Sequence, residues 1–251
     1  MKRMPNIKLT NDELNLMLLD NRFDYGGEAI VVRGNNPHTL YKIFVQPSSN
    51  IPEIISSNKE RKIIELYQKQ LEGATRPLST ISLNDAIVGY EMTYDDGDEA
   101  LLNLDLSPEE KMYVLEKSAD ILEYFATQDV TYGDVKDDNV LYNPKTKQVK
   151  FCDMDNIRVG IFPIDVMGHG LYDYHQIVGV IDEKTDAYMH NLLFLEQLRY
   201  NNLSHKAILN RLKQRPMMPE FPEEVEMLLN GLTQPENFDG RYAVKMIRGR
   251  R

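Results

Sequence analysis

The side chains most suited to chemistry lie in one segment, residues 132–141, which reads Tyr-Gly-Asp-Val-Lys-Asp-Asp-Asn-Val-Leu. Asp134, Lys136 and Asn139 follow the spacing D-x-K-x-x-N, and a second carboxylate, Asp153, comes shortly afterwards. Phosphoryl transfer requires a carboxylate that receives the attacking hydroxyl, and oxygen ligands that hold Mg²⁺ against the phosphates. These residue types could supply both, so phosphoryl transfer is the chemistry that the segment suggests.

Two short elements must bring Asp153 back to the loop that contains Asp134 and Asn139. Residues 143–146, Asn-Pro-Lys-Thr, are typical of a turn, and residues 148–152 predict a short strand that ends at Asp153. A hairpin of this kind would place two carboxylates and an amide around one point. The alternative is a polar surface loop beside an ordinary hairpin, because three fixed residues also occur together by chance.

The segment resembles the catalytic loop of the eukaryotic-type protein kinase family, in which H-R-D-x-K-x-x-N precedes D-F-G. The resemblance implies that Asp134 orients the acceptor hydroxyl and that Lys136 neutralises charge on the moving phosphate. It also implies that Asn139 and Asp153 ligate Mg²⁺ and that ATP is the phosphate donor. A lysine two residues after the aspartate is typical of serine/threonine kinases. Further similarities, in the family's order, extend from about residue 20 to about residue 245.

The family also has a strand lysine that pairs with a glutamate on the following helix. Lys42 lies in residues 39–45, which are rich in β-branched and aromatic side chains. Residues 52–72 show apolar residues at helical spacing and contain two central glutamates, Glu60 and Glu65. The apolar positions cluster around Glu60, so we expect Glu60 to face the core and to pair with Lys42, because an unpaired buried carboxylate is costly. Alternatively, Glu60 is solvated at the edge of the apolar stripe.

The glycine-rich, phosphate-binding loop of the family has its counterpart in residues 24–31, Asp-Tyr-Gly-Gly-Glu-Ala-Ile-Val. Gly26 and Val31 keep the register of G-x-G-x-x-G-x-V, and Gly27 adds a second small residue. Small residues let backbone N–H groups approach phosphates. Considered alone, two adjacent glycines more often form just a turn.

The resemblance also implies an adenine pocket. The carbonyl of Glu91 and the N–H of Thr93 would bind the base, and Val31 and Leu141 would sandwich it. Leu40 stands where the family usually has alanine, which should narrow this pocket.

Several departures from the family pattern bear on activity. Tyr132 and Gly133 replace His-Arg, which argues against switching by a phosphate on the activation loop. Met154 and Asp155 replace Phe-Gly, and residues 153–186 contain no A-P-E triplet, so the acceptor is either a protein or a small molecule that carries a hydroxyl. The first hypothesis is an active, divergent serine/threonine-type kinase. The alternatives are a pseudokinase that binds nucleotide or a partner without catalysis, and an enzyme that acts on a small molecule.

The resemblance implies an α+β, two-lobed protein-kinase-like fold. Residues 1–94 would form a small nucleotide-binding lobe with an antiparallel sheet and one helix. Residues 95–251 would form a larger, mainly helical lobe with the catalytic loop and the metal site. In the larger lobe, Ser-Pro-Glu-Glu at residues 107–110 predicts a capped helix start, and residues 187–200 predict a buried helix. Asp186 would hold the catalytic loop through backbone N–H groups.

Composition restricts the partners and the compartment. The chain of 251 residues carries a net charge of −10, which disfavours nonspecific binding to nucleic acid. No segment approaches the roughly 18–20 uninterrupted apolar residues of a membrane span, so we expect no membrane association. A single cysteine, Cys152, suits a reducing cytoplasm.

Overall fold

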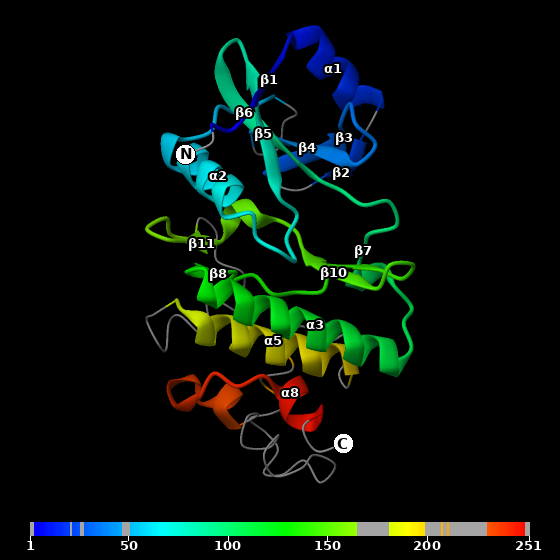
Figure 1. Ribbon diagram of the computed structural model, residues 1–251, viewed down its shortest axis with the longest axis vertical. Helices are drawn as coiled ribbons and strands as arrows, with labels where there is room; N and C mark the ends of the chain where they lie inside the picture. The colour runs from blue at the N-terminus through cyan, green and yellow to red at the C-terminus, as the bar shows by residue number, and fades with distance from the viewer. Residues whose placement is uncertain are drawn as a thin grey trace. The chain divides into compact units, whose positions relative to one another are not determined.

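The computed structural model describes residues 3–20, 22–25, 28–46, 51–164, 181–198, 207, 210 and 230–248. The chain divides into two compact units, Met1–Asp98 and Glu99–Arg251 (Figure 1). The sequence placed the boundary between residues 94 and 95, slightly earlier in the chain.

A six-stranded sheet forms the framework of the first unit. In spatial order its strands are β1 (Asn6–Leu9), β5 (Pro77–Leu83), β6 (Ala86–Thr93), β4 (Thr39–Phe44), β3 (Ala29–Arg33) and β2 (Arg22–Tyr25). β1 is parallel to β5 and the other neighbouring pairs are antiparallel, so the sheet is mixed. Asn84 and Asp85 join β5 to β6 with positive φ angles of 50° and 64°, as a tight hairpin turn requires.

A helix packs on each face of this sheet. α1 (Asn11–Asp20) places its buried leucines in one apolar cluster with Tyr41 of β4. α2 (Ser57–Lys69) places Ile63 in a second cluster with Leu40 of β4. Because neighbouring residues of a strand point to opposite faces, the two helices cover opposite faces of the sheet.

The second unit combines helices with two small sheets. Its described helices are α3 (Pro108–Thr127), α5 (Glu183–Leu198) and α8 (Ala243–Arg248), with short 3₁₀ helices η1 (Leu101–Asn103), η2 (Met154–Asn156) and η3 (Pro235–Asn237). Its strands are β7 (Glu99–Ala100), β9 (Val140–Asn143) and β10 (Gln148–Phe151) in one sheet, and β8 (Val130–Thr131) and β11 (Arg158–Val159) in the other. None of the helices that the structure describes is long and apolar enough to cross a membrane.

Two helices of the second unit confirm their sequence predictions. The Ser107 hydroxyl accepts the N–H of Glu110, and the Glu110 carboxylate accepts the N–H of Ser107, so α3 begins with the expected capping box. In α5, residues 185–195 are all buried, which confirms the prediction of a buried helix around the apolar run of residues 192–195. α3 and α5 lie side by side (Figure 1), and Ser118 Oγ meets His190 Nε2 between them at 2.9 Å.

The predicted two-lobed protein-kinase-like fold is wrong, although the α+β class is right. The first unit has a mixed sheet with a helix on each face, where an antiparallel sheet and one helix were expected. The second unit contains two sheets, where a mainly helical lobe was expected. Sequence reasoning misses β1 and α1 because β1 has only 4 residues and because Leu16 and Leu19 of α1 are exposed, which obscures its apolar stripe.

Gly89 of β6 lies too close to β4 for any side chain to fit. A Cβ atom at this position would lie 2.2 Å from the carbonyl oxygen of Lys42. We predict that Gly89→Ala lowers the free energy of unfolding by about 1–3 kcal/mol, because the two strands must move apart. Urea unfolding followed by circular dichroism measures the change.

Gly160→Ala is the matched control for this prediction. Its Cβ would meet no atom within 4 Å, so only its positive φ of 52° opposes the substitution. A greater loss of stability at Gly160 than at Gly89 would contradict the prediction.

Candidate functional site

The candidate site begins where the chain leaves β8, and the first residues of this loop are anchored by α5. The carboxylate of Asp186 accepts the backbone N–H of Tyr132 at 2.8 Å and that of Gly133 at 2.6 Å. Asp186 is only 1% exposed. Gly133 has a φ of 74°, a left-handed conformation that glycine adopts without steric cost. The contacts confirm the prediction that Asp186 holds this loop through backbone N–H groups.

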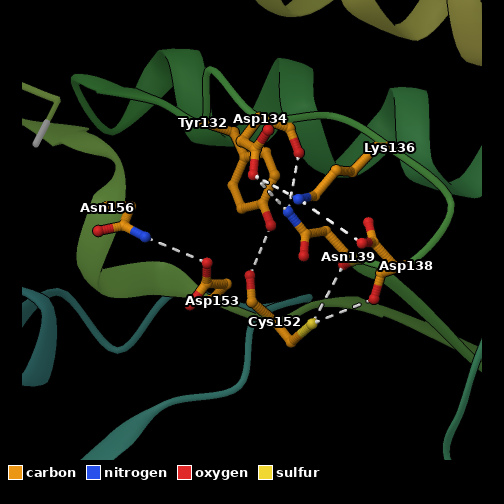
Figure 2. A network of polar contacts seen from close by, with 8 residues as sticks. All are labelled: Tyr132, Asp134, Lys136, Asp138, Asn139, Cys152, Asp153 and Asn156. Carbon is orange, nitrogen blue, oxygen red and sulfur yellow. Dashed lines mark hydrogen bonds and ion pairs between the residues drawn. The ribbon is translucent and has the colours of Figure 1, made fainter. Parts of the chain in front are cut away.

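The loop brings three of the predicted site residues into contact (Figure 2). The Asn139 amide nitrogen donates to the carbonyl oxygen of Asp134 at 3.0 Å and to its Oδ2 at 2.8 Å. Lys136 Nζ lies 3.2 Å from the same Oδ2 and 3.6 Å from Oδ2 of Asp138. The D-x-K-x-x-N spacing therefore produces an interlocked carboxylate, ammonium and amide.

The surroundings of Asp134 make its carboxylate a better proton acceptor. Burial raises the pKa of Asp134, while Lys136 and Asn139 lower it and the negative charge of Asp153 raises it further. Burial lowers the pKa of Lys136, but the carboxylates of Asp134 and Asp138 outweigh it and raise that pKa overall. The site thus holds a permanently charged ammonium beside a carboxylate of raised basicity.

Asp153 follows β10 and adopts a left-handed backbone conformation, with φ 57° and ψ 42°. Asn156 Nδ2 donates to Asp153 Oδ2 at 3.2 Å. The preceding residue, Cys152, donates its N–H to the carbonyl of Asn139 at 3.1 Å. This bond connects the residue after β10 to the loop that contains Asp134 and Asn139 (Figure 2).

The donor set of this site fits Mg²⁺. The Asn139 amide nitrogen is committed to Asp134, so the amide oxygen is the atom left to ligate. Among the described residues, no group of three or more His, Cys, Asp or Glu side chains could hold a metal. Asp153 and Asn139 would hold the ion through a carboxylate oxygen and an amide oxygen. That suits Mg²⁺, which binds through one or two carboxylates and completes its shell with water and substrate phosphates.

The predicted nucleotide-binding residues of the β3–β4 region lie on neighbouring strands where they are described. Val31 of β3 pairs with Lys42 of β4, and Leu40 and Lys42 are both buried. Gly26 and Gly27 lie outside the described residues. The nucleotide-binding roles of these five residues stay predictions.

Glu60 lies in the first turn of α2 and is half-buried. Its pairing with Lys42 stays a prediction. α2 instead buries Lys62, Ile63 and Leu66. Sequence reasoning misses Lys62, which is 1% exposed, because lysine is almost never fully buried. Lys62 lies four residues before Leu66 and therefore on the same face of the helix, which was the signal in the sequence that it is buried.

Glu91 lies in β6, between β5 and β4 in the sheet, and Thr93 is the last residue of that strand. The Thr93 N–H donates to the carbonyl of Arg76 at 3.0 Å, and the Glu91 carboxylate accepts the Ser79 hydroxyl at 2.9 Å. Leu141 is half-buried in β9. Because the Thr93 N–H is already engaged, the adenine-binding roles of Glu91, Thr93 and Leu141 have no support from these contacts and stay predictions.

In comparisons with known proteins, no protein-family model and no curated protein matches the chain.

The anchoring carboxylate of Asp186 generates a pH prediction. Burial raises its pKa to about 7, although the N–H groups of Gly133 and Tyr132 and the charge of Arg158 lower it. Because the folded pKa lies above the unfolded value, this group stabilises the fold most below about pH 4, and the contribution is lost as the pH rises to about 7. We predict that the wild type loses stability over this range relative to Asp186→Asn, which cannot ionise. Thermal unfolding from pH 4 to pH 8 measures the difference.

Asp105→Asn serves as the control, because Asp105 is exposed. This variant should follow the wild-type profile. Parallel profiles for the wild type and Asp186→Asn would show that the Asp186 carboxyl does not titrate in this range.

Proposed function

We propose that the protein is a Mg-ATP-dependent phosphotransferase of the serine/threonine protein kinase type, which transfers the γ-phosphate of ATP to a hydroxyl. The observation that carries the proposal is the interlocked group of Asp134, Lys136 and Asn139, which is bonded to Cys152, the residue between β10 and Asp153. Phosphoryl transfer depends on positioning and on charge stabilisation, and these four side chains supply the required groups.

Asp134 is the proposed acceptor of the substrate's hydroxyl hydrogen. Its carboxylate is half-buried, and burial raises its pKa, so that it is a better base than an exposed aspartate. Its backbone and one of its oxygens are held by Asn139, which fixes the direction of the carboxylate. Lys136 stays charged beside it and is placed to offset negative charge on the phosphoryl group.

Asn139 and Asp153 are the proposed Mg²⁺ ligands. When bound, the ion would neutralise negative charge on the ATP phosphates. The bonds from Asn139 to Asp134 orient the Asn139 amide. The bond from Asn156 orients the Asp153 carboxylate.

The proposed acceptor is a protein or a small molecule that carries a hydroxyl. A cytoplasmic location is part of the proposal and rests on the single cysteine, Cys152. A second candidate function is nucleotide binding without phosphate transfer. Asp155, which replaces the glycine of the kinase family's D-F-G motif and is buried in η2, favours it.

We predict that Asp134→Asn lowers the rate of phosphate transfer at least about 100-fold, because the amide cannot accept the hydroxyl proton. The test follows label from γ-labelled ATP with Mg²⁺, using the protein alone, a generic protein acceptor, or a mixture of hydroxyl-bearing metabolites. Asp105→Asn, which changes an exposed carboxylate of the same unit, should retain the wild-type rate.

The three hypotheses give different results in this assay. Label that reaches protein with the wild type and is lost with Asp134→Asn supports the kinase. Phosphate transfer that occurs only when metabolites are added would show that the acceptor is a small molecule. If ATP raises the thermal stability but no condition gives phosphate transfer, the proposed enzyme activity is refuted and nucleotide binding without catalysis is supported.

A further inference from the structure

Asp153 has a backbone conformation that needs an external restraint. Its φ of 57° and ψ of 42° lie in the left-handed region, which costs a residue other than glycine about 1–3 kcal/mol. Such conformations persist only where surrounding contacts fix them. The question is which contact fixes this one, because the conformation sets the direction of the Asp153 carboxylate.

The peptide group between Cys152 and Asp153 is held by Tyr132. The Tyr132 hydroxyl donates to the carbonyl oxygen of Cys152 at 2.5 Å (Figure 2). This carbonyl and the Asp153 N–H belong to one planar peptide group, so any rotation of that plane changes φ of Asp153. On the other side of Cys152, its N–H is bonded to the carbonyl of Asn139. The residue before Asp153 is therefore fixed through both of its backbone polar groups.

Tyr132 is itself held rigidly enough to act as such a restraint. It is 1% exposed, and its ring packs against Phe151 with a centroid separation of 4.6 Å. Its backbone N–H is bonded to Asp186. Burial raises the pKa of the Tyr132 phenol far above its ordinary value, with a further contribution from nearby Cys152 and Asp153, so the hydroxyl keeps its proton and remains a donor.

We propose that Tyr132 is a positioning residue whose hydroxyl locks the peptide group before Asp153 and so fixes the direction of the Asp153 carboxylate, which accepts the Asn156 amide. The effect of this lock on metal use rests on the proposed phosphotransferase function. The conformational part does not, because it follows from the contacts of Tyr132 and Cys152 alone.

Tyr132→Phe tests the lock, because it removes only the hydroxyl and keeps the ring that packs on Phe151. The matched control is Tyr188→Phe in α5: Tyr188 is also 1% exposed, and its hydroxyl also donates to a backbone carbonyl, that of Leu232, at 3.0 Å. Both variants lose one buried tyrosine hydrogen bond in the same unit. Only the first loses it at the candidate site.

Two readouts separate positioning from general stability. The first is amide hydrogen exchange of peptides that cover residues 149–158, which needs neither ATP nor metal. We expect exchange to rise about fivefold to tenfold in Tyr132→Phe, as loss of one hydrogen bond implies, and to stay unchanged in Tyr188→Phe. The second is the Mg²⁺ concentration for half-maximal phosphate transfer, which should rise about tenfold in Tyr132→Phe alone.

The outcomes distinguish this inference from the proposed function. If the wild type transfers no phosphate but exchange rises only in Tyr132→Phe, the proposed function fails and the lock stands. If the wild type is active and the two variants match in exchange, the lock is overturned. Increased exchange with an unchanged Mg²⁺ requirement would overturn the link to metal use. A Tyr132→Phe protein that fails to fold, beside a folded Tyr188→Phe, would assign the hydroxyl to global stability and overturn the positioning role.

Discussion

The buried carboxylate of Asp186 is the contact on which the geometry of the second unit's loop depends. Two consecutive backbone N–H groups, of Tyr132 and Gly133, point at it. They would otherwise be buried donors without partners, which is costly. The same two residues begin the loop that contains Asp134. The first turn of α5, which contains Asp186, therefore sets the position of the proposed base. A rigid helix thus determines where a short loop places its chemistry.

From that anchor, the loop and the end of β10 are joined by a small number of directed bonds. Tyr132 reaches the carbonyl of Cys152, and Asn139 accepts from the N–H of the same residue while its amide holds Asp134. The first two bonds connect the loop to Cys152, the residue before Asp153, and the third holds the loop together internally. Because the two bonds to Cys152 engage its backbone groups, they fix the main-chain direction just before Asp153.

The sequence predicts those features that depend on nearby residues, and it fails where distant contacts decide. The capping box at Ser107 and the buried face of α5 follow from local spacing, as does the meeting of Asp134, Lys136 and Asn139 within one loop. The Thr93 N–H, in contrast, is taken by a neighbouring segment that no local pattern identifies. The hydroxyl of Tyr132 is equally invisible in sequence, because its partner lies twenty positions away and is a carbonyl that every residue has.

β1 adds a consequence for the order in which the first unit can assemble. Its residues 6–9 pair with residues 80–83 of β5, so the beginning of the chain finds its partner only after most of this unit has been synthesised. Bringing such distant segments together is slow, because the entropy of a long loop must be overcome before the pairing is formed. A nascent chain that stops before β5 leaves strand edges without neighbours, and such edges can pair with other chains. β1 therefore joins this sheet late in the synthesis of the first unit, once β5 has been made.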